Sequence, residues 1–416
     1  MKHLLITMLC IVLMPFYGIG QENSANERAG YFNAVNHAPN DSARMIALLG
    51  LGYNVYAGSK PDSAIYYYDK AYAIAKRLNN KVGLMRYYAC YGDILSAKSK
   101  NYEAINMALK AVAIAESTSN DHLKGAAYNN LAGTYTDVSD VEKGYAYYLK
   151  AIAAYERLDD KKHLAAVYAN VLGIFFSVGH SPERALEYGL KAIAVSRELK
   201  DKFVLAEALV NTSAVYVNLG KLNKALTLLN EARVISERLN DKTTLLTELV
   251  AFNNIFVLQG KYDELKNYTD EIMLLSRETG NGRSLANGEY FLGLYYFNSK
   301  NYSAAKLHFL EAIKKARKNA SPMVEEHAYS AHGDVELLLG DFNAYHESRR
   351  LEDSVRTKLR ADQILINTQE LETKYNVAKK EAEISNLNKA RQIQELTLQR
   401  HTFYITVLTV AVAILM

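Results

Sequence analysis

Small and apolar residues recur along this chain in blocks that return about every 40 residues. The segment NYEAINMALKAVAIA, which starts at Asn101, shows the pattern, and related segments follow it as GYAYYLKAIAAYERL, ERALEYGLKAIAVSREL and NKALTLLNEARVISERL. Apolar positions within each block lie at helical spacing. The blocks open at Ala64, Ala104, Gly144, Ala185, Ala225, Leu265, Ala305 and Tyr345. Their spacings are 40, 40, 41, 40, 40, 40 and 40, so the sequence predicts eight repeated helical units.

Each unit is predicted to hold two antiparallel helices, because small residues recur at two further positions. Seven residues after the opening position stand Ala71, Ala111, Ala151, Ala192, Ala232 and Ala312, with Ile272 and Glu352 as exceptions. Twelve residues before it stand Gly52, Gly92, Ala132, Gly173, Ser213, Gly293 and Gly333, with Asn253 as the exception. Such residues let two helices approach closely, and turn signals such as HSPE and LNDK separate the helices. In HSPE, Ser181 is the expected N-cap and Pro182 the first helical residue.

These positions resemble the tetratricopeptide repeat, whose signature is small and aromatic residues on two antiparallel helices. The resemblance covers residues 40–352 and recurs in all eight units, although the period exceeds the usual length of about 34 residues. The longer repeat looks like the subclass found in peptide-responsive regulators and polarity adaptors. The resemblance implies an all-α fold, a right-handed superhelix of about eight 40-residue helical hairpins whose first and last units act as caps.

The same resemblance implies a concave groove, lined by the first helix of each unit, that holds a peptide or protein segment and performs no chemistry. The family's pattern places these residues there: Arg86, Asn129, Asn130, Asn170, Glu207, Asn211 and Asn287. Their amides could serve an extended peptide backbone, or they could be solvated or tie neighbouring helices together. With Arg86 as the one cation at these positions, the carboxylate clamp of chaperone adaptors is not expected.

The sequence offers no pattern for catalysis or for a cofactor. The net charge of +4 is spread thinly, so nucleic acid is not an expected partner. GNGRSLANG follows no predicted strand and is expected to be a loop between repeats, not a phosphate cradle. The ten His are scattered, and His327 and His332 do not share a helical face, so no metal site is expected. Cys90 is expected to be buried, and the 31 Tyr to fill the core.

Apolar segments mark both ends of the chain. Lys2 and His3 precede an uncharged run and then Gly18 and Gly20, which is typical of a secretory signal peptide over residues 1–20, with cleavage before Gln21. An uncleaved anchor is the alternative, and residues 21–39 are expected to be a linker. Residues 403–416 contain no charge and would cover ~21 Å of a hydrocarbon core about 30 Å thick. Residues 402–416 therefore look like the start of a transmembrane helix.

Residues 353–401 are expected to form a long charged helix, since residues 359–400 contain neither Gly nor Pro. Leu371, Tyr375, Ala378 and Ala382 step by 4, 3 and 4 residues, which indicates a weak coiled-coil seam. We favour a parallel homodimer through residues 360–400, and a solvated linker helix is the alternative.

The order of these segments resembles the extracytoplasmic half of bacterial membrane-bound tetratricopeptide sensor proteins. In that group a histidine kinase or a helix-turn-helix regulator follows the membrane segment. The resemblance implies an exported, periplasm-facing sensor attached to the inner membrane, with its output domain outside this chain. A static membrane-anchored scaffold and a cytosolic peptide receptor are the alternatives.

Overall fold

The computed structural model describes residues 25–57, 60–138, 140–177, 181–200 and 202–360, together with residues 394, 397 and 400. The predicted signal peptide, most of the predicted charged helix and the predicted membrane segment lie outside these residues. Within the described ranges, no helix has the length and apolar character needed to cross a membrane.

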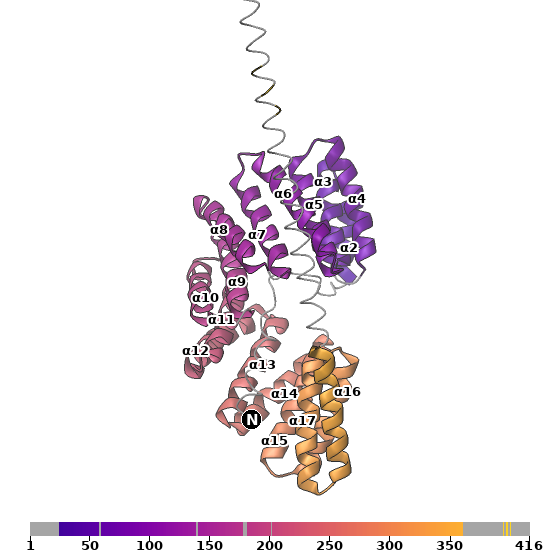
Figure 1. Cartoon of the computed structure of the whole chain (residues 1–416), viewed down its shortest axis with the longest axis vertical. Helices are drawn as coiled ribbons and strands as arrows, with labels where there is room; N and C mark the ends of the chain where they lie inside the picture. Colours follow the sequence, from indigo (N-terminus) through magenta and orange to yellow (C-terminus); the bar gives the residue numbers. More distant parts are fainter. Residues whose placement is uncertain are drawn as a thin grey trace, which may run out of the picture.

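Antiparallel pairs of helices follow one another along the described chain (Figure 1). Before them, α2 (Ala25–Asn36) occupies most of the predicted linker. The first helices of the pairs are α3 (Asp41–Leu51, continued by the π-helical turn η2, Gly52–Tyr56), α5 (Lys81–Ala97), α7 (Asp121–Asp137), α9 (Lys161–Ser177), α11 (Phe203–Asn218), α13 (Lys242–Gln259), α15 (Gly282–Asn298) and α17 (Pro322–Leu339). The second helices are α4 (Pro61–Arg77), α6 (Asn101–Glu116), α8 (Val141–Arg157), α10 (Pro182–Arg197), α12 (Leu222–Leu239), α14 (Tyr262–Thr279), α16 (Tyr302–Lys318) and the helix over residues 342–360.

The second helices begin at residues 61, 101, 141, 182, 222, 262, 302 and 342, which repeats the spacing of 40, 40, 41, 40, 40, 40 and 40. The predicted series of helical hairpins is therefore confirmed. At the α10 boundary Ser181 occupies the N-cap position and Pro182 opens the helix, as predicted, although the Ser181 side chain accepts no capping hydrogen bond.

The breaks between repeats supply the N-caps of the first helices. Side chains of Asn80, Asn120, Asp160, Asp241 and Asn281 each accept a hydrogen bond from a backbone N–H in the first turn of the helix that follows. These polar residues stop one hairpin and start the next. The predicted loop over GNGRSLANG is wrong from Gly282 onward, because Asn281 caps α15 and the residues after it are helical; only Gly280 and Asn281 lie between the two helices.

Curvature follows from how the repeats stack. First helices of consecutive units contact one another from α3 and α5 through to α15 and α17, whereas second helices of neighbouring units touch only sparsely within the described chain. The array therefore bends with its first helices on the inside, as the turn from indigo α2–α6 to orange α16–α17 shows (Figure 1). We call the surface of α5, α7, α9 and α11 that faces the inside of this bend the inner face.

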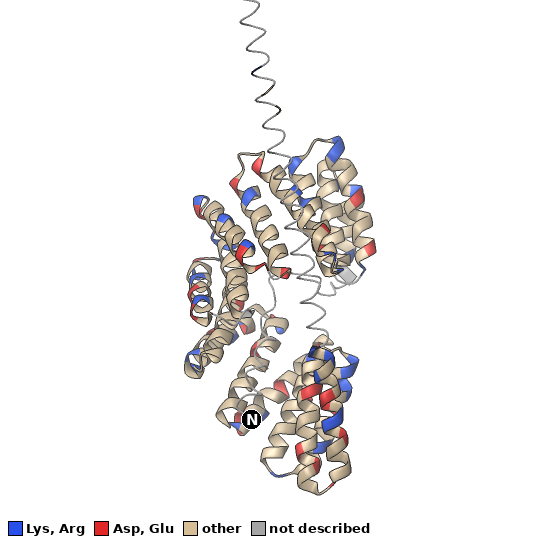
Figure 2. Cartoon of the chain, in the orientation of Figure 1, with Lys and Arg blue, Asp and Glu red and all other residues tan. Residues whose placement is uncertain are grey.

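The core runs along the whole array between first and second helices. The opening small residues are fully buried, as Ala64, Ala104 and Ala305 illustrate. Tyr68 and Tyr155 are among the largest fully buried side chains, which confirms that these tyrosines fill the core. Acidic and basic residues are interspersed along the array (Figure 2).

Candidate peptide-binding face

All seven residues predicted to line the groove lie on first helices. Arg86 is on α5, Asn129 and Asn130 are on α7, and Asn170 is on α9. Glu207 and Asn211 are on α11, and Asn287 is on α15. Contact between consecutive first helices brings part of this set together.

Two hydrogen bonds connect three consecutive first helices. Asn170 Nδ2 donates to Asn129 Oδ1 at 3.0 Å, which joins α9 to α7. Asn130 Nδ2 donates to Asp93 Oδ1 at 2.9 Å, which joins α7 to α5. We call Asp93, Asn129, Asn130 and Asn170 the amide ladder. The amides thus tie neighbouring helices together, which was one of the alternatives that the sequence left open.

Asp93 is a member of the ladder that sequence reasoning missed. Its spacing of 37 residues from Asn130, close to one repeat, was the available signal. Burial, opposed by the hydrogen bond from Asn130 and reinforced by the Asp137 carboxylate, raises the pKa of Asp93 to about 7. Near neutral pH this carboxyl is therefore divided between a form that donates and a form that only accepts.

The ladder also contains an unused acceptor. Asn130 Oδ1 is buried and has no hydrogen-bond partner within the described residues. Leaving a buried acceptor unpaired costs about 1–3 kcal/mol. Because this oxygen is buried, a bound segment cannot reach it in this structure, and the cost belongs to the packing of the ladder.

The other predicted groove residues differ in how much of them a ligand could touch. Asn211 and Asn287 are each 8% exposed, and Asn287 Nδ2 already donates to the Arg283 carbonyl of its own helix at 3.2 Å. Glu207 is half-buried and Arg86 is exposed. The accessible part of the set therefore lies on α5, α7, α9 and α11.

Cys90 lies on α5 one turn after Arg86 and is half-buried. Burial and, to a lesser extent, the Asp93 carboxylate raise the pKa of its thiol to about 12. A thiol that stays protonated at neutral pH is a poor nucleophile and a poor metal ligand. Cys90 therefore contributes packing, against the hydrophobic core of the first repeats around Tyr68.

Removing the Asn130 amide is expected to raise the pKa of Asp93. In Asn130→Ala the carboxylate loses the hydrogen bond that stabilises its charged form, so its pKa should rise above 7 by about one pH unit. Titration of the Asp93 carboxyl carbon by NMR measures the change. Asn170→Ala is the matched control, since its amide binds Asn129. A similar rise in both variants would contradict the assignment.

One cluster has no counterpart in the sequence-based expectations. The structure brings His122 and His163 together with Asp160, although the histidines were interpreted as scattered. The available signal was that His122 and His163 lie 41 residues apart, at the same position of adjacent repeats.

Comparison with known proteins gives no relative by sequence and clear relatives by fold. No protein-family model matches the chain, and no curated protein matches it either. The structure of the apo form of RapI matches with a TM-score of 0.59 at 15% identity, covering 81% of this chain and 98% of that chain. A Rap protein complexed with Competence and Sporulation Factor matches with a TM-score of 0.50 at 15% identity, covering 81% and 97%.

A third similar structure is a signal-transduction ATPase with numerous domains from Pyrococcus horikoshii, which carries a tetratricopeptide repeat sensor. Its TM-score is 0.58 at 16% identity, and the match covers 82% of this chain and 55% of that longer chain. Identities this low show shared architecture. The repeat period, the stacking of first helices and these matches together show that the described chain has the tetratricopeptide-repeat fold.

Proposed function

We propose that this chain is a non-catalytic module that binds a protein segment or peptide on its inner face. The observation that carries the proposal is the amide ladder, which runs across α5, α7 and α9 and places the half-buried side chains of Asn129, Asn130 and Asn170 next to one another. The complex of a Rap protein of the same fold with Competence and Sporulation Factor supports it.

The spacing of the helices sets the length of the ligand. Packed helices lie about 8–10 Å apart, so the path from α5 to α11 spans roughly 24–30 Å. An extended chain rises about 3.3 Å per residue, which corresponds to a segment of about seven to nine residues. Exposed Arg86 at one end favours a segment with an acidic side chain at that end.

Site-specific photo-crosslinking in the native host tests this proposal. A photoreactive phenylalanine at position 86 or 207 of the full chain is expected to form an adduct with the bound partner. The same residue at Asn230, an exposed position on the second helix α12, is the matched control and should form none. Combining Asn129→Ala with Asn170→Ala should reduce the adduct about tenfold. Equal adducts at positions 86 and 230 would place binding elsewhere.

We further propose that the module is exported, attached to the inner membrane and part of a sensor whose output domain lies outside this chain. The proposal rests on the signal-peptide pattern of residues 1–20 and on the charged and apolar segments from residue 353 onward. Cell fractionation and N-terminal sequencing test it, with Gln21 as the expected first residue of a membrane-bound protein. Met1 at the N-terminus of protein in the cytosolic fraction would support the cytosolic receptor instead.

A sensor and a static scaffold differ in what binding does to the helix that follows the repeats. In a sensor, the partner captured at position 86 should change the distance between spin labels at residue 390 of two chains. A distance that stays the same with and without the partner would favour the scaffold.

A further inference from the structure

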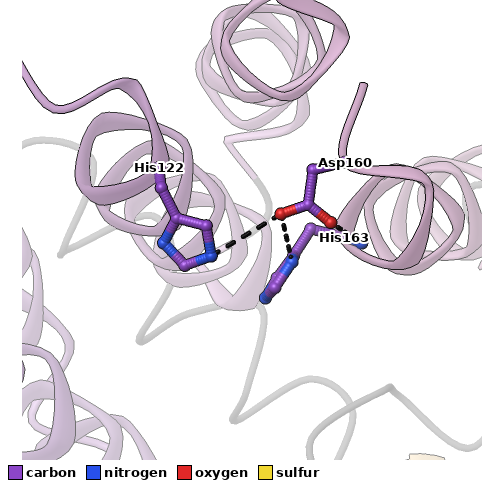
Figure 3. Close-up of side chains that lie close together, drawn as sticks. All are labelled: His122, Asp160 and His163. Carbon is purple, nitrogen blue, oxygen red and sulfur yellow. Dashed lines mark hydrogen bonds and ion pairs between the residues drawn. The ribbon is translucent and has the colours of Figure 1, made fainter. Parts of the chain in front are cut away.

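His122, Asp160 and His163 converge at the start of two neighbouring first helices (Figure 3). His122 is the second residue of α7, Asp160 is the N-cap of α9, and His163 is the third residue of α9. Asp160 Oδ2 lies 2.8 Å from His163 Nδ1 and 3.6 Å from His122 Nε2. One possible ligand atom from each residue lies within 4.8 Å of the other two.

Stacking of equivalent repeat positions explains why the two histidines meet. Each lies ten residues before the small residue of its first helix, Ala132 for His122 and Gly173 for His163. The corresponding positions of the other six units hold Ser42, Val82, Phe203, Thr243, Arg283 and Met323. Histidine thus occurs at this position in two adjacent repeats, where stacking places the imidazoles 4.7 Å apart between ring centroids.

The surroundings hold the three side chains in place. Asp160 Oδ1 accepts a hydrogen bond from the His163 backbone N–H at 3.2 Å, which leaves Oδ2 directed at the imidazoles. The His163 ring stacks on Tyr155 with centroids 5.0 Å apart, and the His122 ring meets the same tyrosine edge-on at 5.8 Å. Tyr155 is only 2% exposed, so its ring is held in the core and restricts the movement of both imidazoles.

The charge of the site suits a cation. Asp160 contributes a carboxylate whose Oδ2 faces both imidazoles. The side chains of His122 and His163 are 47% and 42% exposed, which leaves an open side through which an ion can enter and water can complete its coordination.

We propose that His122, Asp160 and His163 bind one divalent transition-metal ion, of which zinc is the best fit. Two imidazoles and one carboxylate with an open position are a ligand set that zinc accepts, whereas magnesium and calcium prefer oxygen ligands. Ligands about 2.0–2.1 Å from a tetrahedral ion lie about 3.3 Å from one another. The 2.8 Å and 3.6 Å separations reach that value through movements of about half an ångström or less. The two imidazole nitrogens lie within 4.8 Å of each other, so the exposed histidine side chains would have to close by up to about 1.5 Å around the ion.

Binding of a metal ion here would affect the position of the amide ladder. Asn129 lies seven residues after His122, and Asn170 lies seven residues after His163. Seven residues make about two helical turns, so each histidine shares a helix face with an amide of the ladder about 10 Å away. An ion that cross-links α7 to α9 would therefore fix the spacing of the two helices that carry the Asn129–Asn170 hydrogen bond.

Calorimetric titration of the full chain tests the proposal, using protein purified without a histidine tag and stripped with a chelator. Zinc is expected to bind at one ion per chain, and magnesium is expected not to bind. His122→Ala and His163→Ala should each weaken zinc binding at least about tenfold. Asp160→Asn should do the same while retaining the helix cap, because Asn caps as well as Asp. Zinc should raise the Tm of the wild type and leave that of His163→Ala unchanged.

His308→Ala is the matched control, since His308 is a half-buried histidine that pairs with Glu289 on another part of the array. This variant should bind zinc as the wild type does. Circular dichroism checks that each variant keeps its helices, which separates loss of zinc binding from loss of fold. The proposal fails if the wild type shows no saturable zinc binding, or if the double variant His122→Ala, His163→Ala binds zinc as tightly as the wild type.

Discussion

Raising the pH from 5 to 8 is expected to lower the free energy of unfolding of the wild type by about 2.5 kcal/mol through one carboxyl group, that of Glu248. The variant Glu248→Gln should not show this decrease. Glu248 lies on α13 and is fully buried. Burial, reinforced by the Asp241 and Glu237 carboxylates, raises its pKa from 4.5 to about 7. The Ser236 hydroxyl, which donates to Glu248 Oε1 at 2.7 Å, and Arg233 act in the opposite direction.

The sign follows from which state binds the proton. Between pH 4.5 and 7 the folded chain keeps Glu248 protonated while the unfolded chain releases the proton. The folded state then binds more protons, so the free energy of unfolding falls as the pH rises through this window and stays low above it. Glutamine has nearly the same shape and cannot ionise, so the stability of the variant lacks this dependence on pH.

Urea denaturation at pH 5 and pH 8, with hydrogen exchange of α13 as a local probe, measures the effect. Ser236→Ala is the companion variant. It removes a hydrogen bond that favours the charged carboxylate, so its loss of stability with pH should exceed that of the wild type. If the wild type and Glu248→Gln change equally between the two pH values, Glu248 does not retain its proton in the folded chain.

Gly293→Ala is expected to destabilise the C-terminal repeats by about 1–2 kcal/mol. A Cβ atom at Gly293 would lie 2.4 Å from Phe309 Cδ1 and Cε1, and Phe309 is fully buried between α15 and its neighbours. Overpacking of a core typically costs about 1–3 kcal/mol, while alanine gains at most about 1 kcal/mol over glycine within a helix. Thermal and urea denaturation measure the difference.

Gly92→Ala is the matched control because Gly92 holds the same position in another repeat. Its Cβ would find its nearest neighbours, Ala104 O and Met107 Cβ, at 3.5 Å, an ordinary contact. This variant should be neutral or more stable by up to about 1 kcal/mol. Phe309→Leu should partly relieve the clash, so the double variant should lose less stability than the sum of the single changes. Equal effects of the two glycine changes would exclude a clash with Phe309.

The glycines at equivalent repeat positions show what a sequence pattern can predict about helix packing and what it cannot. The pattern predicted close approach of two helices at both Gly92 and Gly293. The structure confirms a requirement for glycine at Gly293, where a large ring faces it, and not at Gly92. The residue opposite determines the requirement, and that residue belongs to the second helix of the hairpin.

The groove residues illustrate a second limit. Periodicity placed Asn211 and Asn287 on first helices, as the structure has them, yet each is 8% exposed. Asn129, Asn130 and Asn170 were equally compatible with peptide binding and with ties between helices. Only the stacking of α5, α7 and α9 shows that they pair with one another and with Asp93.

The sequence by itself determined the repeat period, the succession of helical hairpins and the breaks between them. Those features depend on residues within about ten positions of one another, because helix periodicity and capping are local. The tertiary structure alone decided which side chains meet across repeats, such as Asp93 with Asn130 and His122 with Asp160 and His163. Those partners lie about 40 residues apart. Whether they meet depends on the rotation of each hairpin relative to the next, and side-chain packing between the helices determines that rotation.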